Sequence, residues 1–237
     1  MKIGKLLKGI ESFQRELKAD SHGRFMSWEH CYGMFRAARE AARNGRRPDY
    51  QRLSLHLAFY LASWGMYRGS SFLLQKDYRV HEKAVEIILE RQYDVLQGIE
   101  LSAAKADLVG LESLIMGVYR RLAQYYRSVK KSIPEFADLK YDAISNTLIT
   151  KILLGTLGCV PAYDRYFCDG LGKRNLQKAF SEKSLIQLID YVSASKVEFE
   201  SFRRCKNMQM GGGGVYPPMK LIDMAFWKLG LGNEIAH

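Results

Sequence analysis

Apolar residues along this chain recur mostly at intervals of three and four positions, which is the period of an α-helix. No series of alternating segments joined by hairpin turns is present in the sequence, so β-strands are not predicted. We therefore predict an all-α fold. The predicted helices cover residues 2–18, 28–43, 50–64, 72–76, 82–96, 107–130, 141–157, 185–204 and 220–229.

Turn-forming and helix-breaking residues separate these segments. They lie at 44–48, 64–71, Pro134, Val160-Pro161 and 210–218, the last of which holds four successive glycines. The sequence shows no internal repeat. We predict one helical unit over residues 1–237, compatible with lobes at 1–132 and 133–237, the second packing with the N-terminal helices.

The composition of the chain indicates what kind of partner the protein binds. Hydrophobic residues make up 47% of the 237, enough for a real core. Lys and Arg total 36 against 25 Asp and Glu, a formal charge of +11, with a pI near 9.4. The excess is spread along the chain, which favours a folded basic face that binds a polyanion. A basic protein whose charge is incidental remains the alternative.

Membrane and metal sites are not indicated. No stretch approaches the roughly 18 apolar residues that span a bilayer, and the N-terminus lacks the apolar centre of a signal peptide, so a cytoplasmic location is expected. The cysteines have no C-x-x-C pair and no histidine at zinc-finger spacing, so neither a zinc site nor an iron–sulfur cluster is predicted. They are Cys31, Cys159, Cys168 and Cys205.

Residues 62–71 form the first tract with candidate chemistry. Trp64 and Tyr67 offer faces on which a base could stack, Arg68 offers a fork for a phosphate or a carbonyl edge, and the glycines allow close backbone approach. These features suit a pocket wall. A turn at a helix end with core aromatics explains them equally well.

Asp164 lies among apolar and aromatic residues in the second tract, residues 153–167. A carboxylate in such surroundings needs hydrogen-bond donors or a cationic partner. It could be the N-cap of the helix that follows, or a positioned anion that acts as a base or stabilises positive charge on a sugar. Asp223 is a second-choice carboxylate, which could instead pair with Lys220 or cap the last helix.

The second tract, together with the helix that precedes it and carries an early Thr, resembles the core of the helix-hairpin-helix DNA glycosylase superfamily. That family's typical tract reads L-P-G-V-G-x-K-T-A, an apolar helix, then P-V-D-T-H-V-x-R. Setting Asp164 against the family's catalytic Asp brings Thr147 onto its helix Thr without a gap, and Val160-Pro161 close to its Pro-Val. The resemblance covers about 30 of the 237 residues and implies two packed lobes with a cleft between them.

Two departures from the family pattern matter. Asp142 and Ile144 replace the hairpin glycines, so the usual phosphate-gripping turn is degenerate or absent. Asn146 stands at the position of the Lys found in members that also cleave the strand, and an Asn cannot form a Schiff base. The resemblance therefore implies a monofunctional glycosylase that uses a water nucleophile and needs no metal or other cofactor.

The implied substrate is a damaged or modified base flipped out of DNA, double-stranded DNA being expected, and base release leaves an abasic site. Some divergent members of the family act in antiviral defence on glucosylated phage bases, and this chain could resemble them. No obligate protein partner is indicated. The residues expected at the site are Asp164 as the catalytic group, Trp64, Tyr67, Arg68 and Tyr163 around the base, and Asn146, Thr147, Lys151, Arg165 and Lys220 on DNA.

Two other functions remain open. In a non-enzymatic helical protein that binds DNA or RNA, Asp164 would be only a cap and the basic residues would supply the function. In a helical interaction protein, the positive charge would be incidental and nucleic-acid affinity would be negligible at physiological salt.

Overall fold

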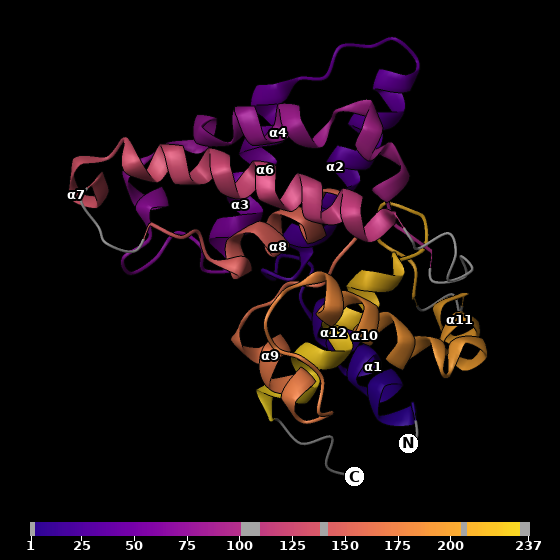
Figure 1. Cartoon of the computed structure of the whole chain (residues 1–237). Helices are drawn as coiled ribbons and strands as arrows, with labels where there is room; N and C mark the ends of the chain where they lie inside the picture. The colour runs from indigo at the N-terminus through magenta and orange to yellow at the C-terminus, as the bar shows by residue number, and fades with distance from the viewer. Residues whose placement is uncertain (1–2, 101–109, 138–141, 205–207, 233–237) are drawn as a thin grey trace.

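The structure, a computed structural model, describes residues 3–100, 110–137, 142–204 and 208–232 and consists of helices joined by turns and loops (Figure 1). Within these ranges the extended structure is limited to one isolated bridge between Gln209 and Val215. The prediction of an all-α protein is confirmed. No helix in the described part of the chain is long and apolar enough to cross a membrane.

Within the described ranges, three short 3-10 helices (η) lie between α3 and α6, on either side of α4. In order, the elements are α1 (Gly4–Ala19), α2 (Met26–Arg43), α3 (Tyr50–Ser63), η1 (Phe72–Gln75), η2 (Tyr78–His81), α4 (Glu82–Ile88), η3 (Arg91–Leu96), α6 (Leu111–Lys131), α7 (Pro134–Ala137), α8 (Asn146–Thr156), α9 (Arg165–Gly172), α10 (Glu182–Ser193), α11 (Lys196–Arg204) and α12 (Pro218–Leu231).

Several predicted boundaries were wrong. In place of one helix over 82–96 the structure has the α-helix α4, which ends at Ile88, and the 3-10 helix η3. In place of one helix over 185–204 it has two, α10 and α11. In place of the helix expected over 72–76 the structure has the 3-10 helix η1, Phe72–Gln75. α8 begins at Asn146 because the Ser145 hydroxyl accepts a hydrogen bond from Leu148 N at 3.2 Å and caps the helix. The predicted starts at 107 and 141 lie outside the described residues.

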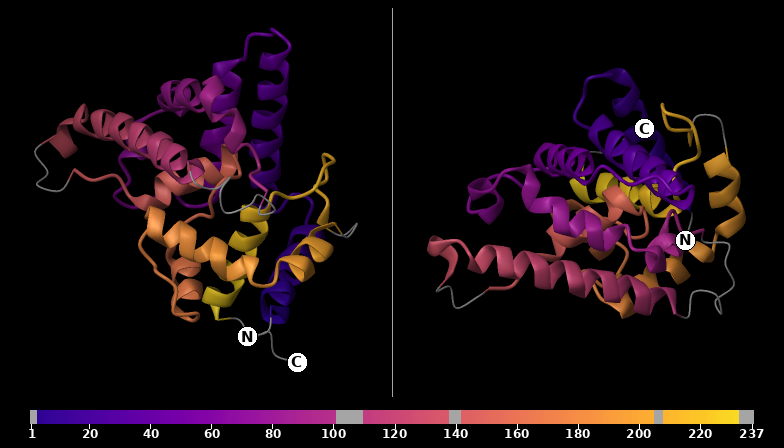
Figure 2. Two further views of the ribbon diagram at one scale, coloured as in Figure 1. Left: turned by 45° about the vertical axis from the view of Figure 1, so that its right-hand side comes forward. Right: turned by 90° about the horizontal axis from the view of Figure 1, so that it is seen from above.

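The helices form two groups (Figures 1 and 2). In one group α8 packs against α2, α3 and α6, and in the other α12 packs against α1 and α9. The N-terminal helix therefore lies with the C-terminal helices. Because α8 belongs with α2, α3 and α6, the division between the groups falls after α8, whereas the lobes considered from the sequence met at residues 132 and 133.

Glycines allow α9 and α12 to approach closely. A Cβ atom on Gly170 of α9 would clash with the carbonyl of Phe226, and one on Gly230 of α12 would clash with the carbonyl of Tyr166. Larger residues at either position would force the two backbones apart. The start of α9 is thereby held against α12.

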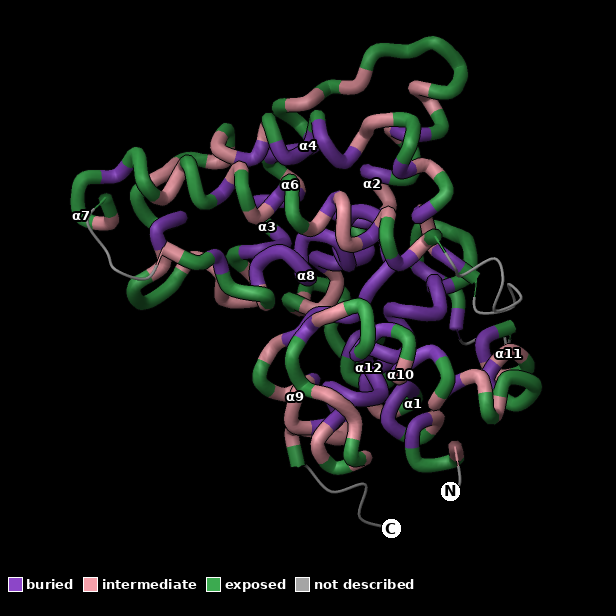
Figure 3. The backbone as a smooth tube through the Cα atoms, viewed as in Figure 1, coloured by how far each residue is buried: buried purple, intermediate pink, exposed green. Residues whose placement is uncertain are grey.

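Two helices, α8 and α12, are buried along most of their length (Figure 3). Both are apolar on nearly every side, the pattern of a helix enclosed by others. Four charged side chains are nevertheless buried on them. Lys228 of α12 pairs with Glu16 of α1, away from the other three. The other three are Lys151 on α8 and Lys220 and Asp223 on α12. Because an unpaired charge is costly to bury, these residues require partners, and those partners define the candidate site.

Candidate active site

Asp164 is the residue immediately before α9. Its Oδ1 accepts a hydrogen bond from Phe167 N at 3.1 Å, which caps the helix. Its Oδ2 lies 3.3 Å from Nζ of Lys151. The side chain keeps 15% of its surface exposed. Asp164 is therefore a helix cap and a partly accessible anion at once, so the two interpretations of this residue are compatible.

The extended segment that carries Asp164 is fixed by side chains from two helices. The Thr147 hydroxyl donates to Tyr163 O at 2.9 Å, and Tyr163 N donates to the Thr150 hydroxyl at 2.9 Å. Ala162 N donates to Oδ1 of Asp223 on α12, also at 2.9 Å. These bonds satisfy buried backbone groups and set the position of the carboxylate.

Asp164 lines an open pocket of about 380 Å³. Three rings and three guanidinium groups lie around it: Trp64, Tyr166 and Trp227, and Arg24, Arg68 and Arg165. All three arginine side chains are exposed. Of the rings, Trp64 and Tyr166 are partly buried and Trp227 is buried. The pocket therefore combines a carboxylate, flat apolar walls and a cationic rim.

Trp64 is locked in place from several sides. Its ring stacks on Phe25 with centroids 5.5 Å apart, and Trp227 meets it edge-on at 6.1 Å. Its indole N–H donates to the Ser27 hydroxyl at 3.2 Å, and the Arg24 guanidinium lies 5.4 Å from its ring centroid. A wall fixed in this way loses little entropy when a flat ligand packs against it.

Lys151 lies at the inner side of the same pocket, with only 5% of its side chain exposed. Its Nζ donates to Trp64 O at 3.0 Å and lies 5.5 Å from the Trp64 ring centroid. Burial lowers the pKa of Lys151, and the nearby Asp164 carboxylate partly offsets that effect.

A second ion pair lies behind the first. Lys220 Nζ is 2.9 Å from Oδ2 of Asp223, and it also lies 5.5 Å from the Trp64 ring centroid. Burial raises the pKa of Asp223, and Lys220 opposes the rise. Both ion pairs border a cavity of about 10 Å³, the size of one water molecule. Of the alternatives considered for Asp223, the structure shows the pairing with Lys220.

The structure gathers most of the residues expected at the site, although some lie elsewhere. Lining the pocket are Trp64, Arg68, Thr147, Lys151, Asp164 and Arg165. The Tyr67 hydroxyl instead bonds to Nε2 of His81 at 2.7 Å. Asn146 is exposed at the start of α8, where it accepts a hydrogen bond from the Tyr119 hydroxyl at 2.5 Å.

Two placements expected from the sequence need correction. Tyr163 was expected beside the base, but its ring is in the core and its hydroxyl lies 3.1 Å from the Ser184 hydroxyl. Lys220 was expected on DNA, but its ammonium is enclosed by Phe13, Trp28 and Trp64 and paired with Asp223. A phosphate cannot reach a cation enclosed in this way.

Three charged or aromatic residues that line the pocket were not among the expected site residues: Arg24, Tyr166 and Trp227. Tyr166 follows Asp164 by two positions, so its closeness in the sequence could have indicated that it lies in the pocket. Arg24 and Trp227 come from opposite ends of the chain, and no local pattern links them to Asp164.

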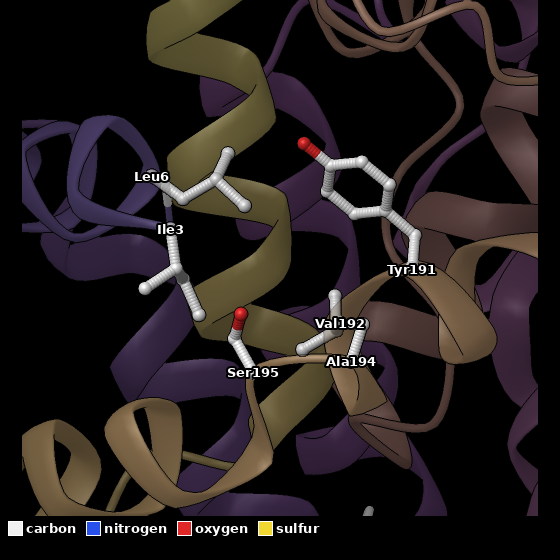
Figure 4. Close-up of a pocket in the computed structure, with 6 residues that line it drawn as sticks. All are labelled: Ile3, Leu6, Tyr191, Val192, Ala194 and Ser195. Atoms are coloured by element: carbon white, nitrogen blue, oxygen red, sulfur yellow. The ribbon is translucent and has the colours of Figure 1, made fainter. Parts of the chain in front are cut away.

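The other cavities carry less chemistry. A groove of about 450 Å³ between residues 65–73 and the start of α8 shares Arg68 with the pocket of Asp164. A smaller, mainly apolar pocket of about 150 Å³ lies between the start of α1 and the end of α10, where Ile3 and Leu6 lie across from Tyr191 and Val192 (Figure 4). Among the described residues, no cluster of three or more His, Cys, Asp or Glu side chains could hold a metal ion.

Comparison with known proteins gave no match: no family model, no curated protein and no solved structure matches this chain. Its function is therefore argued from the chemistry of the pocket.

Proposed function

We propose that this protein is a DNA N-glycosylase, which hydrolyses the bond between a damaged or modified base and its sugar. The observation that supports this most is the position of Asp164, a carboxylate with 15% of its side chain exposed in a pocket walled by Trp64, Tyr166 and Trp227. A base must leave the duplex to reach such a pocket, and aromatic side chains are the surfaces on which flipped bases stack.

The size and charge of the pocket fit this substrate. Its volume of about 380 Å³ falls within the roughly 300–1,000 Å³ of small-ligand sites. Arg24, Arg68 and Arg165 are exposed around it, and guanidinium groups bind phosphate oxygens in a bidentate manner. A nucleotide would place its base among the rings and its phosphates among the arginines.

Asp164 supplies the catalytic charge in this proposal. As the bond to the base breaks, positive charge develops at C1′ of the sugar, and a carboxylate beside the sugar stabilises it. The same carboxylate orients the water that attacks C1′ and accepts a proton from it. Hydrolysis by water also agrees with Asn146, which offers no amine at the position of the family's strand-cleaving Lys.

The test is release of bases from DNA. The protein is incubated with methylated, deaminated and oxidised DNA, and with phage DNA that carries glucosylated hydroxymethylcytosine. Free bases and alkali-labile abasic sites are then measured. Asp164→Asn keeps a capping side chain but removes the charge, so we expect a loss of roughly 100-fold or more in rate with the helix retained.

Asp169→Asn is the matched control, because Asp169 lies on the same helix with 47% of its side chain exposed and pairs with Lys178 at 3.9 Å. Full activity in Asp164→Asn, or no base release from any of these DNAs, would contradict the proposal.

Nucleic-acid binding without catalysis is the second candidate, favoured by the exposed arginines around the pocket and by the capping role of Asp164. It predicts salt-dependent binding to DNA or RNA with no released base. The same incubations therefore separate the two functions.

A further inference from the structure

Breaking a bond between a base and a sugar leaves an electron pair on the base nitrogen. A neutral base departs far more easily if it receives a proton as the bond breaks, and a positioned general acid typically contributes about 10²–10⁴-fold to the rate. In the proposed function Asp164 acts at the sugar, so another group must be the source of this proton. The inference that follows rests on that proposed function.

Lys151 is placed to be that source. It follows Thr147 by one helical turn on α8, and both residues line the pocket. An ammonium group has three N–H donors. The Lys151 ammonium directs donors to Trp64 O at 3.0 Å and towards Oδ2 of Asp164 at 3.3 Å. A third donor remains for a ligand that enters beside Trp64.

We propose that Lys151 is a catalytic general acid, which donates a proton to the base as the base leaves. The bond between C1′ and the base nitrogen breaks, and its electron pair goes to the base. The proton passes from Nζ of Lys151 to the base, which leaves neutral. Water forms the new bond to C1′, and its proton passes to the Asp164 carboxylate.

The ion pair completes the cycle. Asp164 now holds the proton from water, and the neutral Lys151 amine lies 3.3 Å away. Transfer from Asp164 to Lys151 restores the ammonium and the carboxylate. Each turnover consumes one water and needs no other reactant.

The surroundings of Lys151 suit an acid that must give up its proton. Burial lowers its pKa, the charges of Asp164 and Asp223 raise it, and Lys220 lowers it further. The cationic rim of the same pocket consists of Arg24, Arg68 and Arg165. An acid is most effective when its pKa is close to the working pH, and depression from the ordinary value moves a lysine in that direction.

Other cations near the pocket are poorer candidates. The arginines keep their protons, because the pKa of a guanidinium is above about 12. Lys220 is bound to Asp223 and is absent from the residues that line the open pocket. Lys151 therefore combines access to the pocket with a proton that can be released.

The test compares wild type with Lys151→Met and Lys151→Arg in single-turnover assays between pH 5.5 and 10. One substrate is methylated DNA, whose 7-methylguanine and 3-methyladenine are cationic and leave without added protons. The other substrates are DNAs that carry uracil, hypoxanthine, 8-oxoguanine or glucosylated hydroxymethylcytosine, which are neutral near pH 7. Only glucosylated hydroxymethylcytosine lacks a ring N–H that ionises in alkali, so the dependence of the rate on high pH is measured with that base. Lys178→Met, on a lysine with 57% of its side chain exposed, is the matched control.

We expect both Lys151 variants to release neutral bases about 100-fold more slowly or worse, and cationic bases within a few-fold of wild type. The wild-type rate on neutral bases should fall at high pH as Lys151 loses its proton, and this fall should vanish in both variants. Lys151→Arg distinguishes proton donation from the effect of the positive charge, because an arginine keeps the charge beside Asp164 but cannot release a proton.

Three results would overturn the inference: wild-type rates on neutral bases in Lys151→Arg, persistence of the high-pH fall in Lys151→Met, or a wild type that releases only cationic bases. If wild type is active and Asp164→Asn is inactive in any of these cases, the proposed function stands and only the role of Lys151 fails. A wild type that releases no base overturns both.

Discussion

Nζ of Lys151 on α8 lies 3.3 Å from Oδ2 of Asp164 at the start of α9, and the pair borders both the open pocket and the water-sized cavity behind it. The other carboxylate oxygen of Asp164 caps α9. One side chain thus anchors a helix and presents a charge to the pocket. Its two roles can be separated by substitution.

Asp164→Ala removes both the cap and the charge, whereas Asp164→Asn removes only the charge. We expect Asp164→Ala to be less stable than Asp164→Asn by about 1 kcal/mol, the usual value of a cap. Chemical denaturation of both variants at pH 7 measures the difference. Equal stability of the two variants would show that the cap contributes nothing.

We expect Lys151 to lose its proton at a lower pH than an ordinary lysine, because the side chain is buried. Its pKa is lowered in the folded protein, so the unfolded chain binds more protons between the folded and the ordinary value. Stability contributed by this group therefore rises with pH across that window. Side-chain NMR should show Lys151 losing its proton below the ordinary pKa of a lysine, and at still lower pH in Asp164→Asn. An unchanged Lys151 in that variant would contradict the ion pair.

The second ion pair should behave as a coupled unit. Lys220→Met leaves Asp223 buried without its cation, and such a change typically costs about 3–5 kcal/mol. Asp223→Asn keeps an acceptor for Ala162 N but leaves Lys220 unpaired. We expect the double variant to be less destabilised than the sum of the two single variants, as measured by urea unfolding. Simple additivity would argue that the two side chains do not interact.

Acid should destabilise the fold through His81. This imidazole is fully buried between the hydroxyls of Tyr67 and Tyr126, and burial lowers its pKa to about 3. Below the ordinary value of about 6.5 the unfolded chain binds a proton that the folded protein excludes, so stability falls by up to about 1.4 kcal/mol per pH unit. Urea midpoints between pH 7 and 4 test this, and His81→Gln should reduce the slope. A slope unchanged by the substitution would assign the effect to other groups.

The cationic rim should set the salt dependence of binding. Alanine at Arg24, Arg68 or Arg165 should weaken DNA binding by a similar factor for every sequence and reduce the slope of log K against log salt by about one each. Fluorescence anisotropy with a short duplex at several salt concentrations measures the slope. Arg79→Ala, on an exposed arginine already paired with Glu82 at 2.9 Å, is the control and should change neither quantity.

Local patterns predicted much of the fold. α2 and α3 begin and end within two residues of the predicted bounds, because a long amphipathic period and clear turns define them. The break after Ile88 and the division between α10 and α11 were missed, since the apolar period continues across both. Where a period does not change, backbone geometry and packing decide whether a helix ends.

The chain by itself determined that the protein is helical, that it is basic, and that Trp64, Arg68 and Asp164 lie in tracts suited to a pocket. Spacing, composition and capping preference are properties of short segments, so they can be recognised without a fold. Only the tertiary structure decided that Trp227 and Arg24 reach the same pocket, that Lys220 turns inward, and that Lys151 faces Asp164. These relationships depend on how α1, α8, α9 and α12 pack, and packing joins residues that are far apart in the sequence.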